Sequence, residues 1–115
     1  MNGEKVIIYE PAVYNGYAYY LKPSKKEISL YREDGRLIHS FAGECSIKYS
    51  SAQTAYYYIL DQKIFAYQLE NNENVLIDEL DFNDYSISLV TEDYLLLVSN
   101  HQLFYIISII IVSGK

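Results

Sequence analysis

A segment of two apolar, aromatic-rich stretches separated by a short polar turn recurs about every 38 residues along the chain. Its first stretch is found at residues 19–21, 57–59 and 95–97, and its second at residues 28–31, 64–67 and 103–106. A period of this length is typical of repeat proteins, because one unit cannot bury its apolar face alone and must stack on its neighbours. The period therefore predicts an array of similar units within one domain, residues 1–115.

The composition indicates that these units are built from β-strands. Hydrophobic residues make up 50% of the chain, which is enough for a core and too much for a disordered segment. The aromatic residues are 14 Tyr and 4 Phe, and aromatic and β-branched side chains fit a half-buried pleated sheet better than a helix. No long stretch shows the apolar period of a helix. We therefore predict an all-β fold.

Turn residues divide the chain into three predicted units of four strands, at about residues 1–34, 35–72 and 73–115. The predicted strands are 6–9, 12–14, 17–22 and 27–32, then 37–41, 47–50, 54–60 and 63–69, then 75–80, 85–91, 94–99 and 102–112. Asn15-Gly16, Asp34-Gly35 and Asp61-Gln62 mark tight turns, and both prolines are expected in connections rather than in strand interiors. No turn residue interrupts 109–112, so the last strand is expected to be long and to lack a following partner.

Residues 17–41 resemble a β-propeller blade, closest to the NHL-type repeat and similar to WD-repeat blades. Such a blade runs from an aromatic strand through a polar loop, an apolar strand and an Asp-Gly turn to a strand that ends in a Ser-Phe-like pair. Residues 19–21, 23–26, 28–31, 34–36 and 40–41 match these parts in order. The resemblance implies a blade-like architecture and no particular function, because such folds carry many functions.

Three blades are fewer than a closed propeller contains. One interpretation is that two copies associate into a ring of about six blades, with residues 6–9 completing the last blade of the partner. The alternative is that the three units close on themselves with pseudo-threefold symmetry, as in a β-trefoil or a β-prism. We favour the first, because the Asp-Gly turn and the strand order look blade-like, and because both end strands need a partner.

Charge and rare residues exclude several classes of function. The net charge is −6 and the nine Lys and Arg residues are scattered, so no basic face for nucleic acid is predicted. One cysteine, Cys45, allows no internal disulfide, and His39 and His101 lie far apart, so neither a metal site nor a cofactor is expected. Polar residues 99–102 interrupt the apolar stretch 94–112, which is then too short for a membrane span. These features favour a cytoplasmic protein.

The chain contains no recognisable catalytic motif. It has no Gly-rich phosphate loop, no Gly-x-Ser-x-Gly elbow and no paired histidines, and the carboxylates between residues 78 and 93 are expected on the solvated surface. We therefore predict a non-enzymatic interaction or self-assembling β-repeat module, most simply a homodimer, that also binds another protein. A carbohydrate-binding, lectin-like domain is the alternative. The tyrosines that fall outside the repeat period are the predicted binding residues, because Tyr combines a large apolar ring with a polar hydroxyl: Tyr9, Tyr14, Tyr17 and Tyr49.

Overall fold

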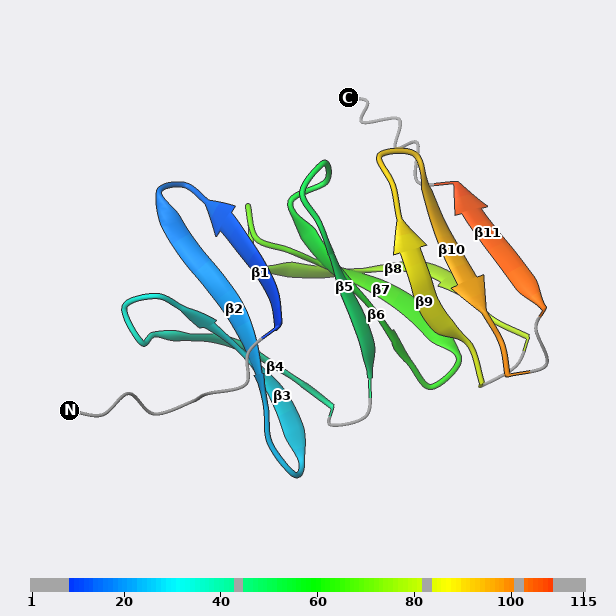
Figure 1. Cartoon of the computed structure of the whole chain (residues 1–115), viewed down its shortest axis with the longest axis horizontal. Coiled ribbons are helices and arrows are strands. Elements are labelled where there is room, and N and C mark those ends of the chain that lie inside the picture. Colours follow the sequence, from blue (N-terminus) through cyan, green and yellow to red (C-terminus); the bar gives the residue numbers. More distant parts are fainter. Residues whose placement is uncertain (1–8, 43–44, 82–83, 101–102, 109–115) are drawn as a thin grey trace. The chain divides into compact units, whose positions relative to one another are not determined.

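The computed structural model describes residues 9–42, 45–81, 84–100 and 103–108, which contain eleven β-strands and no helix. The all-β prediction is thus confirmed. The strands form three antiparallel sheets of four, four and three strands (Figure 1). The chain divides into two compact units, Met1–Cys45 and Ser46–Lys115, which we describe separately.

The first unit is one sheet in which each strand pairs with the next along the chain. Its strands are β1 (Tyr9–Tyr14), β2 (Tyr17–Pro23), β3 (Glu27–Arg32) and β4 (Leu37–Ala42). Asn15 and Gly16 connect β1 to β2 with φ values of 53° and 83°, as a tight hairpin requires. The predicted turn between β3 and β4 is also present, with Gly35 at φ 89°.

The Asp34 carboxylate accepts several hydrogen bonds in the turn between β3 and β4. The Arg32 guanidinium donates two hydrogen bonds to the Asp34 carboxylate, at 2.6 and 3.0 Å. The backbone N–H of Arg36 donates a third, at 3.3 Å. The hydrogen bonds from Arg32 are the main reason that the pKa of Asp34 falls to about 2.

The two faces of the first sheet differ in burial. One face contains the buried apolar side chains of the unit: Ala12, Tyr19, Leu21, Ile28, Leu30 and Phe41. The opposite face contains Tyr20 and Tyr31, cross-strand partners whose rings stack with centroids 5.9 Å apart. Val13 and Leu37 share this second face and are 76% and 51% exposed. We call these four residues the Tyr20–Tyr31 face.

The beginning of the first sheet corrects two predictions. Tyr9 and residues 12–14 lie in one strand, β1, and not in two. The register shifts between Tyr9 and Ala12, where Glu10 has φ 50°, so this irregularity replaces the predicted connection. Pro11 lies inside the strand, and the lack of an N–H is tolerated there because β1 is an edge strand of its sheet. Residues 6–8 of the predicted first strand lie outside the described residues.

The second unit contains two sheets. The second sheet consists of β5 (Ser46–Ser50), β6 (Ala55–Leu60), β7 (Lys63–Gln68) and β8 (Glu73–Glu79), again paired in chain order. The third sheet consists of β9 (Ser86–Val90), β10 (Tyr94–Val98) and β11 (Phe104–Ser108), with β10 in the middle. Asp61 and Gln62, with φ values of 52° and 62°, form the predicted two-residue turn between β6 and β7.

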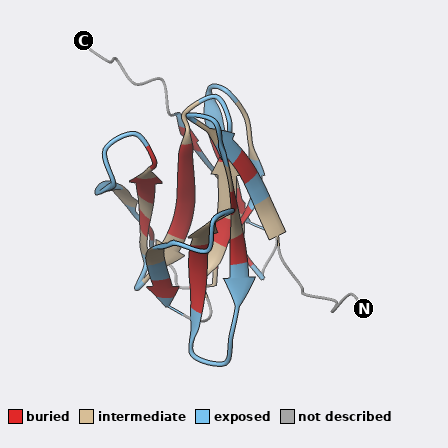
Figure 2. Cartoon of the chain, turned by 90° about the vertical axis from the view of Figure 1, so that its left-hand side faces the viewer, coloured by how far each residue is buried: buried red, intermediate tan, exposed pale blue. Residues whose placement is uncertain are grey.

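One face of the second sheet and one face of the third share a hydrophobic core. Its buried members are Ala55, Tyr57, Ile64, Ala66, Leu80, Tyr85, Ile87, Leu95, Leu97 and Ile107. Buried positions alternate with less buried ones along β10, as expected when one face of a sheet is covered, whereas residues 55–58 of β6 are all buried. Figure 2 shows these continuous and interrupted stretches of buried residues on the strands. Burial raises the pKa of the Tyr57 hydroxyl to about 12.

Hydrogen bonds also connect the two sheets of the second unit. The backbone N–H of Ile87 donates to the Ser46 hydroxyl at 3.0 Å. The Tyr105 hydroxyl donates to the Asp78 carboxylate at 3.1 Å, and this bond is the main reason that the pKa of Tyr105 is raised. The second and third sheets are therefore joined by both apolar and polar contacts.

The predicted boundaries between repeats, at about residues 34/35 and 72/73, are wrong by one strand. β4 pairs with β3 and β8 pairs with β7, so each belongs to the preceding sheet. The physical reason is that a tight hairpin turn joins two neighbours of one sheet, so the Asp34-Gly35 turn cannot separate two units. The third sheet has three strands among the described residues, and residues 109–112 of its predicted last strand lie outside them.

Candidate functional site

The side of the third sheet that faces away from the shared core is apolar and accessible. Side-chain alternation directs Leu95 and Leu97 into the core and Leu96 to the opposite side. Leu96 pairs with Leu89 on β9 and with Ile106 on β11, so these three side chains form a row across the sheet. We call the apolar residues on this side the outer face: Leu89, Tyr94, Leu96, Val98, Phe104 and Ile106. Ser86 and Ser108, the cross-strand partners of Val98 and Tyr94, lie at its margins.

Most of the outer face is open to solvent. The exposed fraction is 51% for Leu89, 50% for Tyr94, 68% for Phe104 and 65% for Ile106. Single exposed apolar residues are common on proteins, whereas a contiguous group marks a surface that contacts something else. None of the six residues is charged, and depletion of charge is typical of the centre of a protein interface.

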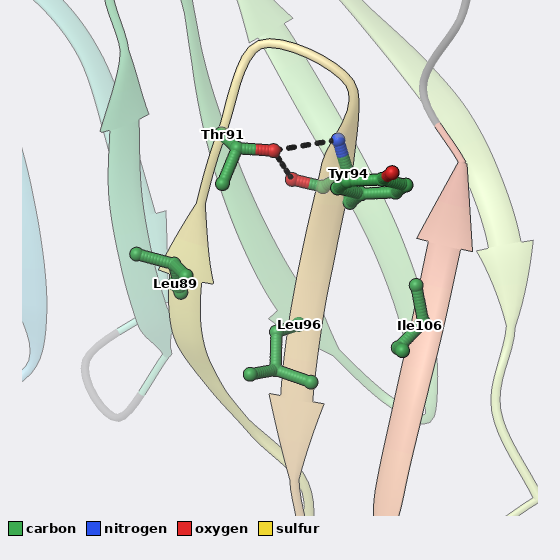
Figure 3. Close-up of a pocket in the computed structure, with 5 residues that line it drawn as sticks. All are labelled: Leu89, Thr91, Tyr94, Leu96 and Ile106. Carbon is green, nitrogen blue, oxygen red and sulfur yellow. Dashed lines mark hydrogen bonds between the residues drawn. The ribbon is translucent and has the colours of Figure 1, made fainter.

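A shallow hollow of about 290 Å³ lies on this face, lined by Leu89, Thr91, Tyr94, Leu96 and Ile106. In Figure 3, Leu89, Leu96 and Ile106 project from three adjacent strands to the same side of the sheet. The Thr91 hydroxyl accepts a hydrogen bond from the backbone N–H of Tyr94 at 3.0 Å and donates to its carbonyl at 3.4 Å. The Thr91 hydroxyl therefore joins the two ends of the β9–β10 turn.

The chemistry of this hollow suits apolar side chains. Small-molecule sites combine an apolar lining with a few converging polar groups, and here the Thr91 hydroxyl already bonds the turn. The carbohydrate-binding alternative needs polar groups for sugar hydroxyls, and it stays a prediction without support from these five residues. A row of aliphatic side chains fits the surface of another protein better.

Three of the predicted binding tyrosines lie in the first unit, on β1 and β2. Tyr14 and Tyr17 are cross-strand partners beside the Asn15–Gly16 turn, and Tyr17 is 38% exposed. The Arg32 guanidinium lies 4.1 Å from the centroid of the Tyr17 ring, so this ring makes a cation–π contact within its own sheet. Tyr9 begins β1 and is half-buried, and burial is the main reason that the pKa of its hydroxyl is raised.

Tyr49, the fourth predicted tyrosine, lies on β5 in the second unit. It is half-buried, its ring centroid is 4.8 Å from that of Tyr56, and burial raises its pKa. The structure thus brings Tyr14 and Tyr17 together within the first unit and places Tyr49 in the other unit. The binding role of the four tyrosines stays a prediction.

Two of the carboxylates between residues 78 and 93 accept hydrogen bonds within the second unit. Asp78 accepts from the Tyr105 hydroxyl, and Asp84 accepts from the backbone N–H of Asn100 at 3.2 Å. In the part of the chain that the structure describes, no three His, Cys, Asp or Glu side chains group closely enough to hold a metal ion. Within the same residues, no helix has the length and apolarity needed to cross a membrane.

Comparison of the chain with protein-family models, with curated proteins and with solved structures finds no match. The outer face is thus characterised by its own geometry and composition.

The sequence analysis missed the outer face, although the chain contains a signal for it. A strand covered on one face alternates apolar and polar residues, whereas β10 is apolar at all five positions. A continuous apolar run predicts a strand that is covered on both faces.

Proposed function

We propose that the protein is a non-enzymatic β-repeat interaction module that self-associates through the outer face of the third sheet. The observation that carries this proposal is the contiguous, uncharged and solvent-exposed apolar surface formed by three adjacent strands. Covering such a surface removes apolar area from water, at about 25 cal/mol per Å². The same surface can receive another protein, and a cytoplasmic setting fits a chain with one cysteine.

The arrangement of the sheets supports the proposal that these units are propeller-blade-like. Two four-stranded sheets and one three-stranded sheet follow each other, each with its strands paired in chain order. In the described residues β11 pairs only with β10, so its other edge offers unpaired backbone groups. Pairing of a strand from a second copy at this edge would complete a fourth strand. Closure as a β-trefoil or β-prism is the alternative.

The oligomeric state tests the proposal directly. Light scattering across a concentration series should give the intact protein a mass above the 13.4 kDa of one chain, rising with concentration. The double variant Phe104→Glu/Ile106→Glu should remain a 13.4 kDa monomer, because buried carboxylates would need desolvation at the contact. Both residues are largely exposed in the single chain, so its β-sheet circular dichroism should not change.

A matched control separates this surface from exposed apolar residues in general. Leu76 on β8 is 49% exposed and lies outside the outer face, so Leu76→Glu should associate as the intact protein does. An intact protein that stays monomeric at every concentration would contradict self-association. Equal loss of association in Leu76→Glu would show that the outer face is not the contact surface.

A further inference from the structure

Among the described residues, β11 differs from the other edge strands because it has no feature that hinders pairing with another chain. Proline, charged side chains and β-bulges are the usual hindrances at an open edge. β1, β4, β8 and β9 each contain one residue more than their partner strand at a shift of register. β5 has a regular register but contains Lys48. β11 pairs with β10 in an unbroken register, and residues 104–108 include neither a charge nor a proline.

The hydrogen bonds of the third sheet show where the backbone groups of β11 point. In an antiparallel pair, alternate residues direct their N–H and C=O groups to the partner strand. The N–H of Ser99 donates to the carbonyl of Leu103 at 2.9 Å, one position before β11 begins. By alternation from Leu103, the backbone groups of Tyr105 and Ile107 point to β10.

The turn between β9 and β10 gives the same alternation. The N–H of Thr91 donates to the carbonyl of Tyr94 at 2.9 Å, so the backbone groups of Tyr94 point to β9 and not to Ser108, its partner on β11. Ser108, Ile106 and Phe104, at alternate positions, therefore direct their N–H and C=O groups to the edge of the sheet. No strand among the described residues pairs with this edge (Figure 1).

We propose that β11 pairs antiparallel with β11 of a second copy, around a twofold axis at Ile106. In this register each Ile106 lies opposite its counterpart, and Phe104 of either copy lies opposite Ser108 of the other. The open backbone groups of all three residues then bond each other, and two three-stranded sheets become one sheet of six strands. This inference rests on the proposed function, since it names the strand through which two copies join.

The side chains of β11 fit this register. Residues 104, 106 and 108 lie on the side of the outer face, so pairing places side chains of the same side next to each other. A shift by one residue would oppose them to Tyr105 or Ile107, whose backbone groups already bond β10. Ile106 is 65% exposed in the single chain, and a cross-strand pair of β-branched side chains is favourable.

Charge also favours a second β11 as the occupant. The chain has a net charge of −6, so two copies repel each other over much of their surfaces. β11 brings no charge to the contact, whereas β8, for example, would bring Glu73, Asp78 and Glu79. Each copy uses its one β11 edge, so the contact is closed and gives a dimer rather than a fibre.

The pairing joins the outer faces of two copies side by side. Leu89 and Leu96 lie on β9 and β10, away from the twofold axis, and they stay accessible in the dimer. The dimer therefore presents an apolar surface of six strands to another protein, which is the second role in the proposed function.

Hydrogen exchange of single amides, measured by NMR, tests the edge pairing. In dilute protein the amides of Phe104, Ile106 and Ser108 should exchange fast, whereas those of Tyr105 and Ile107 should be protected by β10. In concentrated protein the first three should become protected as the mass rises from 13.4 kDa to twice that value. If these three amides still exchange fast in the associated protein, the copies are joined by another surface and the inference is wrong.

A pair of variants at the twofold axis separates the edge from the side chains. Ile106→Pro removes the N–H that the second copy needs, and an edge strand tolerates this loss because β10 does not use that group. Ile106→Val, the matched control, keeps the N–H and an apolar side chain. Ile106→Pro should remain a 13.4 kDa monomer with unchanged β-sheet circular dichroism, and Ile106→Val should dimerise. Dimerisation of both variants would contradict edge pairing.

Disulfide cross-linking identifies the occupant without relying on a proline variant. In a Cys45→Ser background, Ile106→Cys should give a covalent dimer with oxidised glutathione, because opposed residues have Cα atoms about 5.5 Å apart. Ser108→Cys should give none, since its two copies lie four residues apart along the strands, about 14 Å. An associating protein without the cross-link at position 106 would mean that another strand occupies the edge.

These outcomes are distinct from failure of the proposed function. An associating intact protein that Phe104→Glu/Ile106→Glu disrupts keeps the proposed function, even if the amides and the cross-link exclude pairing of β11 with β11. A monomeric intact protein contradicts both proposals.

Discussion

At the scale of single residues, the hairpin turns depend on backbone conformations that few side chains adopt. Asn15 and Gly16 both have positive φ, as does Gly35 in the turn between β3 and β4. Residues with a Cβ atom are strained in this region, whereas Gly is not and Asn tolerates it. These turns could be predicted from the sequence because the residue types and the conformations are closely linked.

Gly35→Val should destabilise the protein more than Asp34→Asn. No atom lies within 4 Å of the position of an added Cβ at Gly35, so the cost comes from its φ of 89°. Left-handed backbone costs a residue with a Cβ roughly 1–2 kcal/mol, and a β-branched side chain is more restricted still. Asp34→Asn weakens an exposed ion pair with Arg32, and exposed pairs contribute little. Urea denaturation of the two variants measures the difference, and equal midpoints would contradict this account of the turn.

The roles of single tyrosines could not be predicted in the same way. Tyr17 falls outside the repeat period, yet its ring lies under the Arg32 guanidinium of the same sheet. A cation–π contact depends on the cross-strand register, which the sequence does not specify by itself. The sequence could therefore predict the abundance of tyrosine contacts but not the partner of each ring.

At the scale of strands, β10 shows how adjacent residues serve different surfaces. Leu95 and Leu97 are fully buried in the core of the second unit, and Leu96 points to the outer face. A change at Leu95 or Leu97 should affect the stability of the fold, and a change at Leu96 should affect association.

Leu97→Ala should lower the free energy of unfolding by about 2–5 kcal/mol, because it removes buried methyl groups and leaves a cavity. The matched change Leu96→Ala should cost about 1 kcal/mol or less in dilute protein, where the outer face is uncovered. Urea denaturation at low protein concentration measures both values. Similar losses for the two variants would mean that the faces of β10 are not separated as described.

The existence of most strands could be predicted, but their grouping into sheets could not. The predicted strand at residues 27–32 coincides with β3, because its apolar residues are typical of a strand and turn residues lie on both sides of it. The grouping failed because the repeat period gives the length of a unit but not the residue at which the unit begins. Only the pairing of the strands shows where one sheet ends and the next begins. That pairing assigns β4 to the first sheet and β8 to the second.

At the scale of the whole molecule, a sheet needs a second layer to cover its apolar face. The second and third sheets supply such layers to each other and share one core. The outer face has no cover among the described residues of its own unit, and the apolar run of β10 was its only sign in the sequence. Periodicity predicts which residues share a face, but not what covers that face.

The second unit should fold without the first. Residues 46–115 contain both layers of the core around Tyr57 and Leu97, together with the bond from Tyr105 to Asp78. The described residues of the first unit form a single sheet, and a single layer by itself leaves the apolar side chains of both its faces open to water. Fragment 46–115 should therefore show one cooperative urea transition, and fragment 1–45 should show none.

Leu97→Ala within fragment 46–115 provides the control, because it should lower the midpoint of that transition if the core has formed. The dilute fragment must be compared with the dilute intact protein, since association through the outer face would stabilise either one. A fragment 46–115 without a cooperative transition would mean that two layers are not sufficient. Residues 1–115 would then fold only as the single domain that the repeat period predicts, with each sheet depending on the whole series.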